Sequence, residues 1–318
     1  MRTFARTLGP ALVLALVAFA PGARAQGIEL LQGELDASEP DHVLVPFTVP
    51  EGTVEIEIRH DNLVAANVID WGVYDPSGFR GWGGGLDETV VINEKAASRC
   101  YVAGPLPAGT WHLVLGKAKI VTAPAAYRAE VETRVAPAVP VLDPQPERQP
   151  YVAPAALATG ARWWPGDFHV HSRESGDARP TLDEVLAFAA TRGLSFVELS
   201  EHNTTSQLDF YNAAQAKSPD VLLLPGVEYT TYDGHANGIG ATTWVDHKIG
   251  FGGLTIEAAA TAFRDQGAVF ALNHPTLDLG NECIGCAWKH ELDLGLVGAY
   301  EIGIGGWDET GQLFSPGA

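Results

Sequence analysis

Positive charge is scarce in this chain of 318 residues. Lysine and arginine together number 20, aspartate and glutamate number 39, and the formal net charge is −19. Because an anionic surface repels a phosphate backbone, we expect no nucleic-acid partner. Long apolar runs are also lacking beyond residue 25, so no later segment is a candidate for crossing a membrane.

Cysteine is equally rare, with Cys100 in the first half of the chain and Cys283 and Cys286 in the sequence CIGC. A zinc knuckle needs a second cysteine or histidine pair at matching spacing, and none stands near CIGC. In an oxidising compartment the CIGC pair predicts a small disulfide loop, with two unreactive thiols as the alternative. Cys100 is then expected to be buried and unpaired.

Residues 1–25 have the three parts of a secretory signal peptide. Two arginines supply a positive start, an apolar run covers residues 8–20, and the sequence ARA ends at Ala25 as an A-x-A cleavage site. The alternative is an uncleaved anchor, for which the apolar run is short. We therefore expect cleavage near Ala25 and a mature protein that is periplasmic or secreted.

Short β-branched or aromatic segments, separated by turn signals such as DPSG and LPAGT, follow one another through residues 26–135. Their regular spacing predicts an all-β sandwich domain. Trp71, Trp82 and Trp111 are expected in its core, with stacking on a ligand as the alternative. Three scattered histidines are expected at the surface or half-buried, namely His42, His60 and His112.

A proline- and alanine-rich linker is predicted over residues 136–162, because proline favours extended chain. In the predicted domain of residues 163–318, apolar strand-like segments alternate with helical ones, which indicates a parallel sheet or an α/β barrel. The helix expected over residues 180–194 starts with a T-x-x-E capping box formed by Thr181 and Glu184.

Histidines and one glutamate stand at the ends of successive predicted strands in this second half. Strand ends of parallel α/β folds meet at one rim, so these side chains are expected to converge. His169 and His171, two residues apart, point to the same side of a strand and can approach one ion. A single H-x-H pair would also be compatible with packing, but recurrence at each strand end predicts a metal centre. The converging residues are His169, His171, His202, Glu228, His235 and His274.

The second half also resembles a known family, the PHP (polymerase and histidinol phosphatase) superfamily. The resemblance covers residues 163–305 and is carried by DFHVHS, SGD, TLDEVLAFAATRGLSFVELSEHN, GVEYTT, GHANGIG and NHP. It implies a distorted seven-stranded βα barrel. Together with the signal peptide and the sandwich segments VIDWGVYDPSGFRGWGGG and GPLPAGTWHLVLG, it is similar to the extracytoplasmic branch that includes carbaryl (carbamate) hydrolase.

The resemblance implies a role for each converging residue. His169 and His171 match ligands of one metal, Glu228 matches a carboxylate that bridges two ions, and His235 and His274 match ligands of the second ion. Imidazole nitrogens with a bridging carboxylate suit two or three divalent ions of zinc, manganese or iron.

Asp177 and His202 match positions that hold a third ion where one is present, and Glu228 and His202 are the expected catalytic residues. Glu201 stands where the family usually has aspartate, and SGD replaces the commoner SDG. The family's late Asp-x-His is missing, so the chain is expected to be a fragment or an incomplete barrel. Glu301, at the end of the last predicted strand, is a further candidate near the site.

The predicted activity is hydrolysis of a carbamate, amide or ester bond in a small-molecule substrate by a metal-bridged hydroxide. A phosphoesterase of the same fold is the second candidate, and a non-catalytic extracytoplasmic binding protein is the third. Arg173 and Arg179 are expected to bind an anionic group of the substrate, with solvated loop arginines as the alternative. Asp246, His247 and Lys248 are interpreted as a plain surface loop, with a loop at the edge of the pocket as the alternative. No oligomeric state is predicted.

Overall fold

The structure is a computed structural model, and the residues that it describes are 26–36, 38, 40–138, 148–280, 283–303, 306–307 and 313–314. The predicted signal peptide and residues 139–147 of the predicted linker lie outside them. Within the described part of the chain, no helix has the length and apolarity needed to cross a membrane.

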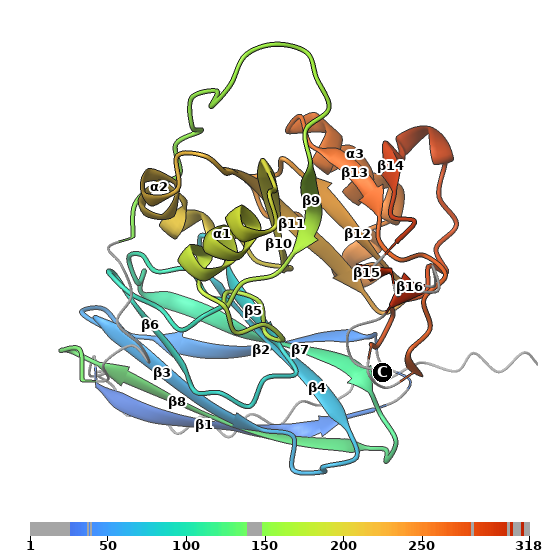
Figure 1. Cartoon of the computed structure of the whole chain (residues 1–318). Coiled ribbons are helices and arrows are strands. Elements are labelled where there is room, and N and C mark those ends of the chain that lie inside the picture. Colours follow the sequence, from blue (N-terminus) through green and yellow to red (C-terminus); the bar gives the residue numbers. More distant parts are fainter. Residues whose placement is uncertain are drawn as a thin grey trace, which may run out of the picture.

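Two four-stranded antiparallel sheets form the first half of the chain, here called the two-sheet unit (Figure 1). Apolar side chains from both sheets share one buried core. In order across the first sheet, the strands are β1 (Gly27–Leu35), β8 (Ala125–Arg134), β3 (Glu55–Asp61) and β6 (Val90–Asn93). In order across the second sheet, they are β2 (His42–Val49), β7 (Gly109–Lys119), β4 (Val68–Asp75) and β5 (Gly78–Gly84).

The period-two pattern of the sequence explains these strands. In β8, alternate side chains from Ala125 to Val131 are buried, while those between them face outward. Trp71 and Trp111 belong to the shared core, as expected from the sequence. The sequence reading did not name β1 or the glycine-rich β5, which follows an Asx turn in which Asp75 Oδ1 accepts hydrogen bonds from two backbone amides.

The second half contains a curled six-stranded mixed sheet in the order β14-β13-β12-β11-β10-β9. Strands β9, β10 and β11 are parallel, but β12 runs antiparallel to both β11 and β13. The expectation of a parallel sheet is therefore wrong here. Its strands are β9 (Gly166–Val170), β10 (Phe196–His202), β11 (Leu222–Thr231), β12 (Gly234–Ile239), β13 (Val269–Leu272) and β14 (Ala299–Tyr300).

A tight hairpin causes this reversal. Only Tyr232 and Asp233 separate β11 from β12, and Gly234 follows with φ +149°, a backbone conformation that glycine adopts readily. The D-G dipeptide is a known hairpin signal, but the sequence analysis placed His235 just beyond a predicted strand and named no hairpin there.

Three α-helices pack on one face of the mixed sheet. The capping box at the start of α1 is confirmed, because the Glu184 amide donates to Thr181 Oγ1 at 3.2 Å and the Thr181 amide donates to Glu184 Oε2 at 2.8 Å. The sequence reading missed α2, whose polar and apolar residues are poorly segregated. The helices are α1 (Leu182–Thr191), α2 (Leu208–Lys217) and α3 (Ile256–Asp265), with 3-10 turns η1 (Phe251–Gly253) and η3 (Leu294–Leu296). Two short strands, β15 (Gly306–Trp307) and β16 (Leu313–Phe314), pair with each other as a separate sheet.

Because side chains alternate along a strand, the helices cover one face and leave the other face for polar groups. Val197, Leu199 and Leu223 pack under α1 and α2. The residues of opposite parity, among them Glu198 in β10 and Glu228 in β11, are buried on the other side. The concave face of the curled sheet is thus lined with carboxylates rather than with an apolar core.

The second sheet of the two-sheet unit lies against the mixed sheet (Figure 1). Arg99 Nη1 donates to the carbonyl oxygens of Ser175 and Ala178 at 3.2 and 3.1 Å. Thr204 Oγ1 donates to the carbonyl oxygen of Cys100 at 3.0 Å. These bonds join the two halves next to the loop between β9 and α1.

This junction overturns two surface predictions. His42 is only 5% exposed and stacks on Tyr232 with ring centroids 5.3 Å apart. His247 and Lys248 are buried, and Lys248 Nζ donates to Tyr74 OH at 2.6 Å. Both errors have one cause: the contacts that bury these residues come from the other half of the chain, which local sequence patterns do not reveal.

Candidate metal centre

Glu228 is a fully buried carboxylate near the end of β11, and histidine rings surround it. It is the common neighbour of all five strand-end histidines. Its carboxylate oxygens lie 3.3 Å from His169 Nε2, 3.3 Å from His171 Nε2, 2.9 Å from His202 Nδ1, 3.2 Å from His235 Nδ1 and 3.5 Å from His274 Nε2. The structure therefore brings together the six residues that the sequence placed at strand ends, while their role as metal ligands stays a prediction.

The register of the mixed sheet explains the convergence. In the parallel pairing of β10 with β11, His202 stands directly beside Glu228. His235 follows on β12 after the hairpin, opposite Thr230. His274 comes just after β13, and its backbone has φ +27°, a rare conformation for a residue with a side chain.

Electrostatics keep Glu228 ionised. Burial raises the pKa of this carboxyl, but His202 and His169 outweigh the burial and hold the pKa well below its ordinary value. The same pairing acts on the rings: burial lowers the pKa of His169, yet Glu228 and Glu301 raise it to about 10. The negative charge of the carboxylates thus favours positive charge at the centre. Protonated imidazoles supply that charge here, and a divalent cation would also supply it.

Three groups of side chains have ligand atoms within 4.8 Å of one another, the spacing that a shared ion requires. The donors are imidazole nitrogens and carboxylate oxygens, with one sulfur, which suits zinc, manganese or iron. The buried Nδ1 atom of His274 has no hydrogen-bond partner among the described residues, so it is free to bind an ion. The groups are His169 with Glu228 and His274, His171 with Asp177 and His202, and His235 with His274 and Cys286.

Outer contacts orient the rings. Glu301 Oε2 lies 3.0 Å from His169 Nδ1 and accepts a hydrogen bond from the His274 amide at 2.9 Å. Ser175 Oγ lies 3.0 Å from His171 Nδ1. Such partners fix ring orientation and tautomer in metal sites, as Thr230 also does for His202. Glu301 was a sequence candidate, whereas no sequence pattern pointed to Ser175.

Asn273 is a further residue that the sequence reading missed. Its Nδ2 donates to Glu228 Oε1 at 2.9 Å and to Asn237 Oδ1 at 2.8 Å. Because Asn273 donates to one carboxylate oxygen of Glu228 and is itself held by Asn237, it fixes which way the carboxylate faces. The available signal was its position directly before His274, at the end of a predicted strand.

Asp177 pairs with His202, with Oδ2 at 3.1 Å from Nε2, although 61% of its side chain is exposed. Burial raises the pKa of Asp177, but His202 outweighs this and lowers it. Glu201 belongs to none of the three ligand groups: it accepts hydrogen bonds from the amide and hydroxyl of Ser172, and burial raises its pKa to about 8. Glu201 therefore holds the end of β9 in place.

The two candidate substrate-binding arginines lie outside the cleft beside the centre. The Arg179 side chain is 81% exposed, and its Nη1 lies 3.7 Å from a carboxylate oxygen of Glu88. Arg173 is half-buried in the same loop, and neither residue belongs to the described cleft lining. The structure thus favours the alternative of loop arginines.

A cleft of about 350 Å³ opens between the two-sheet unit and the mixed sheet, beside His202 and Asp177. The two-sheet unit supplies one wall, which includes Asp70, Trp82 and the glycines of residues 83–85. No lysine or arginine lines the cleft among the described residues. No local sequence pattern indicates that the first half of the chain contributes to the site.

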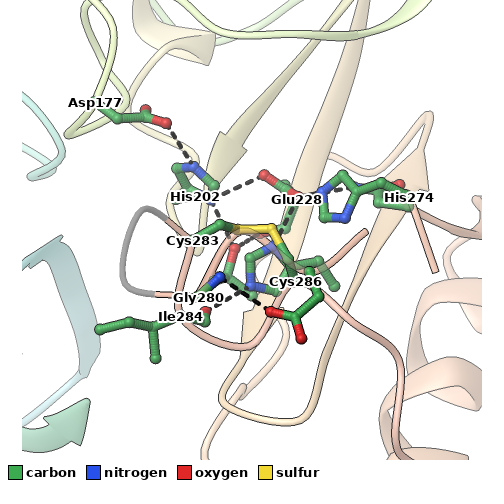
Figure 2. The surroundings of a disulfide bond; sticks show 12 residues. Asp177, His202, Glu228, His274, Gly280, Cys283, Ile284 and Cys286 are labelled. Atoms are coloured by element: carbon green, nitrogen blue, oxygen red, sulfur yellow. Dashed lines mark hydrogen bonds and ion pairs between the residues drawn. A yellow bond between two sulfur atoms is a disulfide. The ribbon is translucent and has the colours of Figure 1, made fainter. Parts of the chain in front are cut away.

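A disulfide joins Cys283 to Cys286 beside the histidines, as Figure 2 shows. This confirms the predicted loop of CIGC, and Cys100 is buried and free, as expected. Cys283 and Ile284 line the cleft. The carbonyl oxygen of Ile284 lies 3.3 Å from His235 Nε2, so the loop also fixes that ring.

The sequence matches no family model and no curated protein. Among solved structures, it is similar to a two-domain protein from Bacteroides vulgatus ATCC 8482 containing a predicted PHP-like metal-dependent phosphoesterase, with 23% identity and TM-score 0.34, over 50% of this chain and 49% of that one. The chain therefore spans about half the length of that protein.

Two further solved structures are similar over shorter stretches. An amidohydrolase from Chromobacterium violaceum is 18% identical with TM-score 0.28, over 37% of this chain and 69% of that one. Aeromonas hydrophila PliG, a periplasmic inhibitor of g-type lysozyme, is 13% identical with TM-score 0.25, over 37% of this chain and 93% of that one.

Proposed function

We propose that this protein is a metal-dependent hydrolase that cleaves an ester, amide or carbamate bond of a small uncharged substrate. The observation that carries the proposal is a buried, ionised Glu228 with five imidazoles within 3.5 Å, next to a cleft. Scattered core histidines do not converge on one carboxylate, whereas hydrolytic metal centres need such a set.

The proposed architecture follows the sequence reading. It comprises a signal peptide over 1–25, a β-sandwich domain over 26–135, a linker over 136–162 and a partial PHP-like domain over 163–318. Two four-stranded sheets around one core support the sandwich. The curled sheet, with helices on one face and the histidines at its strand ends, supports the PHP-like domain.

In this proposal His169, His171, His235 and His274, together with Glu228, would hold two divalent ions. Bound ions of this kind act as Lewis acids and lower the pKa of a coordinated water. The chain's own contribution is to hold these donors rigid and buried, through Glu301, Asn273 and Ser175, so that little reorganisation accompanies the reaction.

His202 has the position of a proton donor or of a third-ion ligand. It lines the cleft, with Nε2 near Asp177 and Nδ1 near Glu228. Burial lowers the pKa of His202, but these carboxylates raise it well above its ordinary value. With two ions bound, we propose that the protonated ring delivers its proton to the leaving group. With three ions, His202 and Asp177 hold the third.

The charge of the cleft favours a carbonyl substrate over a phosphoester. Its lining includes the carboxyls of Asp70 and Asp177 and no described lysine or arginine, and Val68, Leu86 and Ile284 add apolar surface. Burial raises the pKa of Asp70 to about 6. Tyr232 OH donates to Asp70 at 2.8 Å, which leaves the other carboxyl oxygen for a polar group of the substrate.

The test compares 4-nitrophenyl acetate with 4-nitrophenyl phosphate, using protein loaded with zinc, manganese or iron. We expect hydrolysis of the acetate at a higher kcat/KM than the phosphate, and a fall of at least about 100-fold in the Glu228→Gln variant. Glu51→Gln, at an exposed turn, is the matched control and should retain the wild-type rate. If the phosphate is hydrolysed faster than the acetate, the substrate is a phosphoester and the proposal of a carbonyl substrate is wrong. If Glu228→Gln keeps its activity, the assignment of the centre to Glu228 is wrong.

A non-catalytic binding role gains no specific support. Its proposed platform consisted of exposed tryptophans, yet Trp71, Trp82 and Trp111 are all buried. Two of them pack in the core, and Trp82 forms part of the cleft wall. The described surface of the two-sheet unit therefore presents none of these three rings for stacking on a polymer.

A further inference from the structure

The Cys283–Cys286 disulfide lies against the candidate metal centre (Figure 2). Cys286 is buried, and its sulfur forms one of the ligand groups with nitrogens of His235 and His274, all within 4.8 Å of one another. The sulfur is at present bonded to Cys283. The mechanism proposed above makes no use of it.

The loop that carries Cys286 has little room to move away. A Cβ added to Gly285 would lie 2.3 Å from the carbonyl oxygen of Thr231, and the backbone there has φ +82°, so glycine is required. On its other side, the carbonyl oxygen of Ile284 contacts His235 Nε2 at 3.3 Å. Breaking the disulfide would therefore leave the Cys286 sulfur near the two histidines.

Oxidation state decides whether this sulfur can bind a metal. A disulfide sulfur is a poor ligand, whereas a cysteine thiolate is among the strongest ligands for zinc and its chemical relatives. In the function proposed above, Glu228, His235 and His274, whose ring nitrogens lie 3.2 and 3.5 Å from the carboxylate, would supply three protein ligands to one ion and would leave a fourth position open. A fourth protein ligand turns a catalytic arrangement into a closed, structural one.

We propose that reduction of the Cys283–Cys286 disulfide makes Cys286 a ligand of the ion held by His235 and His274, and thereby closes the centre. The oxidised protein is the open form. The effect on hydrolysis rests on the function proposed above, whereas the change in metal ligation does not. A hydrolase of this kind stays inactive in a reducing compartment and becomes active where the disulfide forms.

The reductive step is thiol–disulfide exchange with a small dithiol. Its thiolate attacks the sulfur of Cys283, which lines the cleft, and the S–S bond breaks with Cys286 leaving as a thiolate. The second thiol of the reagent then attacks the reagent's sulfur in the mixed disulfide, which releases Cys283 as a thiol. Two electrons pass to the disulfide, and the reagent ends as a cyclic disulfide. A nearby cation stabilises the leaving thiolate.

Cobalt(II) reports the ligand change directly, because a cobalt–thiolate bond gives an intense charge-transfer absorption in the near ultraviolet. Cys283→Ala and Cys286→Ala form a matched pair, since each removes the same disulfide and leaves one thiol of the pair, while the buried Cys100 is common to both. We expect the charge-transfer band in cobalt-loaded Cys283→Ala and its absence in Cys286→Ala. Wild-type protein should show the band only after anaerobic reduction and removal of the dithiol.

Hydrolysis of 4-nitrophenyl acetate gives the second readout. Reduction should lower the wild-type rate at least tenfold, and reoxidation should restore it. The rate of Cys286→Ala should be insensitive to the reductant, while Cys283→Ala should be slow with or without it.

The outcomes separate the two proposals. If Cys283→Ala binds cobalt without a charge-transfer band while the oxidised protein hydrolyses the ester, this inference is overturned and the proposed function stands. If the band appears but no variant hydrolyses any ester, the ligand switch stands and the proposed function is overturned. If no form of the protein binds cobalt, both are overturned.

Discussion

The surroundings of a buried histidine can either raise or lower its pKa, and this protein contains both cases. Around Glu228, carboxylates raise the pKa of His169 and His202, so these rings bind a proton or give way to a cation. His42 is buried at the junction of the two halves instead. Its Nδ1 has no hydrogen-bond partner among the described residues, and burial lowers its pKa to about 4.

His42 should make the free energy of unfolding decrease as the pH decreases. In the folded protein the pKa of His42 is about 4, which is below the ordinary value of 6.5. Between pH 4 and pH 6.5, His42 is therefore protonated in the unfolded chain and neutral in the folded protein. Stability is therefore complete above pH 6.5 and declines as pH falls toward 4, by about 2–3 kcal/mol from this group. Urea unfolding at pH 7 and pH 4.5 measures it. The difference between the two pH values should shrink in His42→Phe, and an unchanged difference would contradict the assignment.

At the scale of elements, the loop between β9 and α1 carries Asp177 and is held by Arg99, which lies in a turn between β6 and β7 of the two-sheet unit. Arg99 bonds Glu88 through two nitrogens, at 2.9 and 2.6 Å, and donates to two carbonyl oxygens of that loop. Bonds from a charged donor are worth more than neutral ones. The position of Asp177 thus depends on a residue about 80 positions earlier in the chain.

Arg99→Met keeps the length of the side chain and removes these bonds. We expect a loss of about 2 kcal/mol in the free energy of unfolding, because the loop carbonyls lose a charged donor. Amide hydrogen exchange over residues 172–178 should accelerate while exchange in α3 stays unchanged. Equal acceleration in both segments would show global destabilisation and would contradict a local clamp.

Elements were predictable where their signals are local. The strands with period-two burial, the capping box at Thr181 and the CIGC disulfide loop all follow from a few neighbouring residues. The sequence reading missed the β11–β12 hairpin despite its D-G signal, and α2 because its apolar stripe is weak. It also named Glu228 and the five histidines around it, since strand ends of such sheets share one rim.

The whole molecule has features that only long-range packing creates. The cleft combines Asp70 and Trp82 from the first half with His202 and Cys283 from the second. Buried His42 and Lys248 depend on the same junction. No local pattern encodes such contacts, which explains why the role of the two-sheet unit as a cleft wall was not predicted.

The central claim, that Glu228 organises a multi-metal centre, is tested most directly by counting bound ions. Metal-free protein would be dialysed against zinc, manganese or iron and analysed by elemental mass spectrometry, beside Glu228→Gln and the exposed control Glu51→Gln. The account predicts at least two ions per chain in the wild type and the control, and fewer than one in Glu228→Gln. Less than one ion in the wild type, or equal loading of Glu228→Gln, would contradict it.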